Sequence, residues 1–143
     1  MGHREYRGKS IESGQWVTGF YVHDVEWAKH WIYHLVKGPV YYQLSRTEVL
    51  EDSVGQWTGK VDRGGEKIYE GQMVFDEDDK YLVVWNEDDA CYQLNLYGPG
   101  MYRNENGGEE WTNDDRDLGY AGIDMDVVSV MEIVKDENEQ GER

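Results

Sequence analysis

The fold class of this chain is decided by the stretch YLVVWNEDDACYQLNL, residues 81–96. Its first five residues, 81–85, are all apolar or aromatic, and residues 90–96 mix apolar with polar side chains. Between them, NEDD at 86–89 consists of residue types that favour turns. Two extended segments around a short polar turn predict a β-hairpin.

Short aromatic and β-branched segments continue this pattern on both sides of the hairpin. We predict further strands at 15–22, 40–44, 54–60, 67–69, 73–75 and 127–134. Turns are expected at 63–66 and at Asn106-Gly107, and Gly98-Pro99-Gly100 is expected to end the strand that returns through 90–96. The chain is therefore predicted to be mostly β, with little helix, in one domain over residues 1–143 that closes with an acidic tail at 136–143.

The segment 24–39 leaves two structures open. Asp24 at its start and Gly38-Pro39 at its end suit the two ends of a helix, and its apolar residues recur at helical spacing. Residues 30–36, however, are rich in the aromatic and β-branched types that prefer strands. Periodicity alone slightly favours the helix.

The composition describes a folded but aliphatic-poor protein of 143 residues. Val, Leu, Ile and Phe together number only 29, while six Trp and 11 Tyr supply large apolar surfaces. No apolar run approaches the length of a membrane helix, and the chain begins with no secretory signal pattern. A single cysteine excludes an internal disulfide, which fits a reducing compartment.

The charge is strongly asymmetric. Residues 1–72 carry nine Lys or Arg and ten Asp or Glu, a net charge of −1, whereas residues 73–143 carry five and 20, a net charge of −15. The second half is therefore a candidate interaction face. Its candidate residues are Asp76, Glu77, Asp78, Asp79, Glu87, Asp88, Asp89, Asp114, Asp115 and Asp117.

Such a polyanion is repelled by nucleic-acid backbones and by anionic membrane surfaces. We therefore expect neither direct nucleic-acid binding nor membrane binding. Because loops at one end of a barrel can converge, we expect clusters 76–79, 87–89 and 113–117 to form one continuous negative face. Solubility alone would explain the charge, and a basic protein partner is the sharper interpretation.

Metal-binding and catalytic patterns are weak. His30 and His34 are four residues apart, but no third ligand stands at a matching spacing. Residues 113–124 approach a calcium-binding loop, yet the glycine and the final glutamate are misplaced. Cys91 is expected to be a buried, unreactive thiol in its strand. With no phosphate-binding loop or nucleophile elbow, we expect a protein that is not an enzyme and holds no cofactor or metal.

A longer motif, DSVGQWTGKVDRGGEKIYEGQMV at 52–74, resembles the YopX family of phage and prophage proteins. That family has a pattern like TVGQ[YF]TGLxDxxGxxIYEGDIV, from which Gln72 departs by replacing the usual acid. YRGK at 6–9 and GQWVTGF at 14–20 are similar to the family's opening segment. These segments lie within residues 6–74, a span of about half of the chain.

The resemblance implies a mostly β protein with a small, irregular SH3-like barrel and N-terminal hairpin strands. It shifts the expectation for 30–36 towards a strand, and it implies a life in a bacterial cytoplasm. It brings no catalytic residues. The residues of the motif themselves indicate a scaffold, with a turn at 62–65, either a positive φ or a close backbone contact at Gly71, and Trp57 and Tyr69 in the core.

Three functional hypotheses follow. The first is a non-enzymatic phage or prophage accessory protein that acts by protein–protein interaction through its acidic second half. The second is a DNA mimic that inhibits a host nucleic-acid-binding protein, because carboxylates spaced like phosphates can occupy basic grooves. The third is an uncharacterised metal-dependent enzyme that uses His30 and His34 or the carboxylates.

Overall fold

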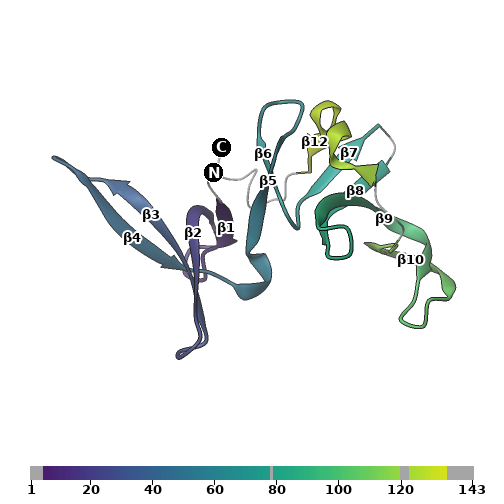
Figure 1. The fold of residues 1–143 in the computed structure, drawn as a ribbon, viewed down its shortest axis with the longest axis horizontal. Helices are drawn as coiled ribbons and strands as arrows, with labels where there is room; N and C mark the ends of the chain where they lie inside the picture. Colours follow the sequence, from purple (N-terminus) through teal and green to yellow (C-terminus); the bar gives the residue numbers. More distant parts are fainter. Residues whose placement is uncertain (1–4, 78, 120–122, 135–143) are drawn as a thin grey trace. The chain divides into compact units, whose positions relative to one another are not determined.

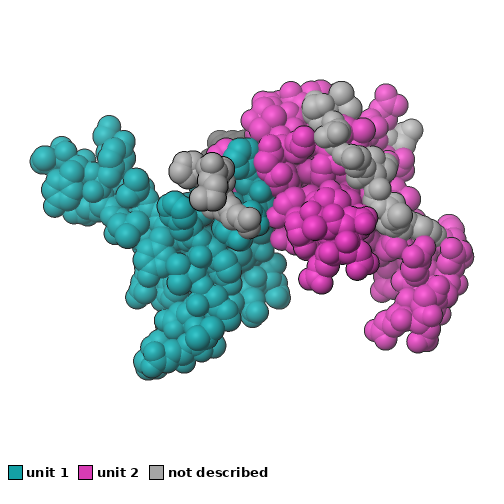
Figure 2. All heavy atoms as spheres, viewed as in Figure 1, with its two compact units in different colours: residues 1–57, 135–143 teal, residues 58–134 magenta. Residues whose placement is uncertain are grey.

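The computed structural model describes residues 5–77, 79–119 and 123–134. The chain divides into two compact units, unit 1 up to Trp57 and unit 2 over Thr58–Val134 (Figure 2). The expected mostly-β class is confirmed, since the described helix consists of two short 3₁₀ segments, Glu51–Ser53 and Met125–Val130.

Unit 1 is an antiparallel sheet of long strands with a small core. Its strands are β1 (Tyr6–Lys9), β2 (Trp16–Asp24), β3 (Lys29–Lys37), β4 (Tyr42–Glu48) and the start of β5 (Gly55–Val61), in the spatial order β4-β3-β2-β1-β5 (Figure 1). Ile32 and Val49 are its fully buried aliphatic side chains among the described residues. Most of its other apolar side chains keep contact with solvent.

The open question at 24–39 is resolved in favour of strand β3, so the helix suggested by periodicity is wrong. The strand preference of the aromatic and β-branched residues at 31–36 prevails over the helical spacing of the apolar residues, because β3 pairs with a strand on each side. Asp24 still acts as a cap, but of a turn, since its Oδ1 accepts hydrogen bonds from the backbone N of Glu26 and Trp27 at 3.1 and 3.2 Å.

Gly19 marks the point where β2 changes partner. Up to Gly19 the strand pairs with β1, and from Phe20 onward it pairs with β3. A Cβ atom on Gly19 would lie 2.1 Å from the Tyr33 carbonyl oxygen, closer than any side chain tolerates. Glycine is therefore required for the two ladders to meet there.

Unit 2 is built on the hairpin that the sequence predicts. Strands β8 (Asp79–Asn86) and β9 (Cys91–Arg103) pair from Lys80 with Tyr97 to Asn86 with Cys91. The remaining elements of the unit are β6 (Lys67–Tyr69), β7 (Met73–Asp76), β10 (Glu109–Asp117), β11 (Ile123–Asp124) and β12 (Glu132–Ile133). The order β10-β9-β8-β7-β12 is open among the described strands, with β10 and β12 as its edges rather than a closed barrel.

The core of unit 2 covers one face of this sheet. Val74, Val83 and Leu94 from three neighbouring strands are at most 1% exposed. Met125, Val128 and Met131 from the second 3₁₀ segment and its flanks pack against them. Tyr69 is buried, as predicted, whereas Trp57 is only half-buried.

Two boundary predictions are wrong. Gly98-Pro99-Gly100 does not end β9, which runs on to Arg103, because the partner strand β10 takes up the irregularity opposite Pro99. The segment 127–134 is not one strand, because residues up to Val130 form a 3₁₀ turn that brings Val128 into the core before the two-residue β12.

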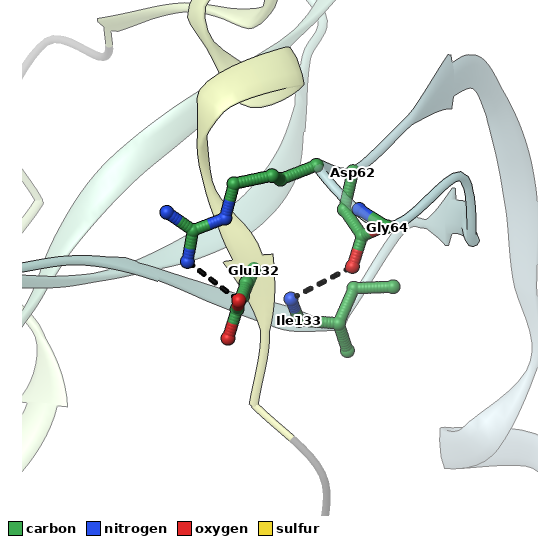
Figure 3. A network of polar contacts seen from close by, with 5 residues as sticks. Asp62, Gly64, Glu132 and Ile133 are labelled. Carbon is green, nitrogen blue, oxygen red and sulfur yellow. Dashed lines mark hydrogen bonds and ion pairs between the residues drawn. The ribbon is translucent and has the colours of Figure 1, made fainter.

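The turn predicted at 62–65 is present and holds β12 in place. Asp62 is 7% exposed, and its Oδ1 accepts hydrogen bonds from the backbone N of Gly64 and Glu66, both at 2.9 Å. Its Oδ2 faces the backbone N of Ile133 at 3.2 Å (Figure 3). Further along the motif, Gly71 has the expected positive φ, at 89°. The motif is thus a set of backbone anchors.

Candidate functional site: an acidic groove on unit 2

The acidic residues of the β7–β8 and β8–β9 turns lie at opposite ends of β8. Asp76 pairs with Asp79 at the start of the strand, and Asn86 pairs with Cys91 at its end. Eight residues of strand separate the two turns by about 25 Å. The expectation of one continuous face therefore fails for residues 87–89, while Asp78 lies outside the described residues.

The third acidic cluster, residues 113–117, was predicted to lie in a loop, but it lies in strand β10. The β10–β9 ladder is regular up to Thr112 opposite Gly100 and resumes at Arg116 opposite Gly98. Residues 113–115 thus face Pro99 alone, which has no backbone N–H to donate to the ladder. This bulge leaves Asp114 and Asp115 exposed to solvent.

The register brings this bulge to the same end of the sheet as Asp79. Tyr97 of β9 pairs with Lys80 on one side and with Asp117 on the other. A groove of about 320 Å³ lies here, which we call the acidic groove. It is lined by Asp79, Lys80, Leu96, Tyr97, Gly98, Pro99, Asp115 and Leu118.

The chemistry of the acidic groove is mixed. Two carboxylates, Asp79 and Asp115, stand with a single ammonium group, Lys80, beside apolar atoms of Leu96 and Leu118. The negative potential also acts on Tyr81 next to Lys80. Burial, and then the charges of Asp79 and Asp76, raise the pKa of the Tyr81 hydroxyl. The groove therefore presents carboxylates, one ammonium group and apolar atoms together.

Asp117, in contrast, has a structural role. Its Oδ1 accepts a hydrogen bond from the backbone N of Gly119 at 2.8 Å, and its Oδ2 accepts one from Asn95 Nδ2 at 3.3 Å. Asn95 Oδ1 in turn accepts from Gln93 Nε2 at 2.7 Å, and Gln93 Oε1 accepts from Asn86 Nδ2 at 2.8 Å. The sequence analysis does not predict this row of amides on β8 and β9, because the only signal of Gln93 and Asn95 is their alternation with apolar residues.

A second hollow of about 590 Å³ lies along the β9–β10 hairpin. Tyr102 OH donates a hydrogen bond to Glu110 Oε2 at 2.7 Å, and the Arg116 guanidinium stands 4.4 Å from the centre of the Tyr102 ring. The hydrogen bonds from Tyr102 and Asn104 lower the pKa of Glu110, and the bond to Glu110 raises the pKa of Tyr102. These contacts join the two strands of the hairpin.

The two histidines do not share a site. His30 is 8% exposed, its Nδ1 lies 2.6 Å from Tyr21 OH, and its Nε2 lies 3.7 Å from Glu51 Oε2. His34 Nε2 lies 3.0 Å from Thr47 Oγ1. Within residues 5–77, 79–119 and 123–134, no three His, Cys, Asp or Glu side chains gather as metal ligands do.

Cys91 is exposed, so the prediction of a buried thiol is wrong. It stands at the first position of β9, directly after the acidic turn, where the strand has not yet entered the core. The near-miss calcium loop at 113–124 begins inside strand β10 and so lacks the compact loop geometry of such sites. The side chains of Asp124 and Asp126 lie outside the described residues.

No helix among the described residues is long and apolar enough to cross a membrane. No protein-family model matches the chain, and a comparison with curated proteins finds no match either.

Proposed function

We propose that this protein is a non-enzymatic accessory protein of a phage or prophage that binds a basic protein partner through the acidic groove. It would act in the bacterial cytoplasm. The observation that carries the proposal is the bulge at 113–115, which sets Asp115 at the same groove as Asp79 from a distant part of the chain. A bulge that re-aims side chains is typical of functional edges of sheets.

The groove suits a protein partner better than a small molecule. Its lining combines the carboxylates of Asp79 and Asp115 with apolar atoms of Leu96 and Leu118. Protein interfaces combine an apolar centre with a polar rim in the same way. A Lys or Arg side chain of the partner would reach Asp79 and Asp115, while an apolar neighbour would cover the centre.

The phage or prophage origin rests on the resemblance of residues 52–74, 6–9 and 14–20 to the YopX family. In the structure these segments anchor backbone, as Asp62 and Gly71 illustrate. This scaffold role leaves the acidic groove, which lies outside these segments, to bind the partner.

The test is a co-purification with two variants that remove equal charge. The first variant, Asp79→Asn, Asp114→Asn and Asp115→Asn, changes the groove and its bulge. The second, Glu87→Gln, Asp88→Asn and Asp89→Asn, removes three charges at the opposite end of β8. Each tagged protein is recovered from lysogenic or infected cells, and the bound proteins are identified.

We expect a partner that the wild type and the second variant retain and the first variant loses. Equal loss in both variants would attribute binding to net charge and would contradict a role for the groove. A nucleic-acid-binding protein displaced by DNA would favour the DNA-mimic hypothesis instead. Stoichiometric metal in the purified protein would favour the enzyme hypothesis.

A further inference from the structure

Strands β3 and β4 continue as a two-stranded ribbon beyond the rest of the sheet of unit 1 (Figure 1). Strand β2 pairs with β3 only from Lys29 to Tyr33. From His34 to Ser45 the two strands pair with each other alone, and the turn is closed by a hydrogen bond from Gly38 N to Tyr41 O at 3.0 Å. We call residues 34–45 the arm.

The arm exposes many large apolar side chains to solvent. Its large apolar side chains are 45% to 87% exposed. They are Leu35, Val36, Val40, Tyr41, Tyr42 and Leu44. An isolated two-stranded hairpin is marginally stable in water, and contiguous exposed apolar side chains of this kind indicate an interaction site.

One face of the arm combines these side chains with positive charge. Leu35 lies opposite Leu44, and Lys37 lies opposite Tyr42, so all four share a face. Arg46 follows on the same face, where its Nη1 donates a hydrogen bond to Tyr33 OH at 3.3 Å. Residues 27–47 contain three Lys or Arg and no Asp or Glu, in a chain of net charge −16.

The acidic groove has the complementary chemistry. Residues 58–134 carry six Lys or Arg and 19 Asp or Glu, a net charge of −13. The groove presents Asp79 and Asp115 beside apolar atoms of Leu96, Tyr97 and Leu118. The arm thus offers apolar side chains with a cation, and the groove offers apolar atoms with carboxylates, so the two surfaces are complementary.

We propose that the arm of one molecule docks into the acidic groove of a second copy of this chain. The inference rests on the proposed function of the groove, and it names the arm of a second copy, with its Lys37, as one partner of the groove. Such a contact joins two different surfaces, so after the first contact one molecule keeps a free groove and the other keeps a free arm. Further copies add at these free surfaces, which leads to closed rings or open chains.

Sedimentation velocity of the full chain tests the proposal over micromolar to millimolar concentrations, at about 20 mM and about 500 mM NaCl. We expect larger species as concentration rises at low salt, and weaker association at high salt. A monomer under all of these conditions would overturn the proposal.

Variants locate the contact. The arm variant Tyr42→Ser and Leu44→Ser, and the groove variant Asp79→Lys and Asp115→Lys, should each weaken association by about tenfold or more. The matched control is Val25→Ser and Trp27→Ser, which changes apolar residues 79% and 69% exposed in the β2–β3 turn. Unchanged melting curves show that each variant is folded, and equal weakening by the control would overturn the assignment to the arm.

Mixing the two defective variants is the sharpest measurement. The arm variant keeps its groove and the groove variant keeps its arm, so one intact contact forms between them. We expect a mixed dimer that grows no further, whereas each variant alone stays monomeric. No complex in the mixture would overturn the arm-to-groove contact.

Two further outcomes separate this inference from the proposed function. In the first, the wild type is monomeric in sedimentation while the groove variant still loses the co-purified protein. That result would overturn the inference and leave the proposed function standing. Self-association that survives in the groove variant but not in the arm variant overturns the arm-to-groove contact, and the co-purification still tests the proposed function independently. Binding of a single-stranded oligonucleotide by the arm, without self-association, would identify a different occupant.

Discussion

The Oδ2 atom of Asp62 accepts a hydrogen bond from the backbone N of Ile133 at 3.2 Å, across 71 residues of sequence. One buried carboxylate thus serves the turn after β5 and the last strand of unit 2 at once. Beside it, Arg63 Nη2 donates a hydrogen bond to Glu132 Oε1 at 2.5 Å, between side chains 57% and 48% exposed. The two neighbours therefore allow a buried and an exposed polar contact to be compared.

Asp62→Ala should lower the free energy of unfolding by about 3 kcal/mol, because three backbone N–H groups lose their acceptor. Arg63→Ala should cost less than about 1 kcal/mol, because the ion pair is solvated. Denaturant unfolding of both variants measures the difference, with Asp62→Asn as an intermediate that keeps one acceptor oxygen. Equal effects for Asp62→Ala and Arg63→Ala would show that Asp62 is not the anchor.

Glu70, in the turn between β6 and β7, predicts a pH dependence. Burial raises the pKa of its carboxyl in the folded protein. The protonated form is thus favoured by folding, so its contribution is present below the unfolded pKa and is lost as pH rises through the folded pKa. Glu70→Gln should therefore raise the melting temperature at about pH 7 and leave it unchanged at about pH 3.

Calorimetry of both proteins across this pH range measures the effect. The control is Glu66→Gln, at an exposed position of the preceding turn. A gain for Glu70→Gln that persists unchanged at low pH would point to packing rather than to ionisation.

Salt should stabilise the protein. Carboxylates in the β7–β8 turn and in the bulge crowd one end of the unit 2 sheet, and like charges within about 10 Å repel at low salt. The melting temperature should therefore rise between about 10 mM and about 200 mM NaCl. Asp79→Asn together with Asp115→Asn should reduce that rise.

A flat melting temperature across the salt series would mean that these charges are too dispersed to repel one another. Sodium chloride and potassium chloride should give the same curve, since screening depends on ionic strength rather than on the cation. A difference between them would indicate specific ion binding.

Cys91 should react rapidly with a neutral maleimide in the folded protein, because its side chain is exposed. Mass spectrometry follows the labelling under native conditions and in denaturant. Comparable rates in the two conditions are expected. Labelling that is slower by a factor of about a hundred or more in the native state than in denaturant would mean that the structure around Cys91 must unfold locally before the thiol reacts.

The sequence alone determined the class of the fold, because alternating aromatic and β-branched segments with short polar turns leave few structures other than antiparallel sheets. It also located the β8–β9 hairpin, the turn at 62–65 and the positive φ of Gly71, each of which depends on residues close together in the chain. Local chemistry at these positions is strong enough to fix local geometry.

The tertiary structure decided what depends on distant partners. The segment 30–36 became a strand because β2 and β4 flank it, and β9 continued through Pro99 because β10 absorbed the irregularity in its bulge. The same bulge places Asp115 in the groove that Asp79 also lines, while the length of β8 separates both from residues 87–89. Strand register cannot be read from one segment, since it is set where two segments pair, and so only the folded chain brings the groove together.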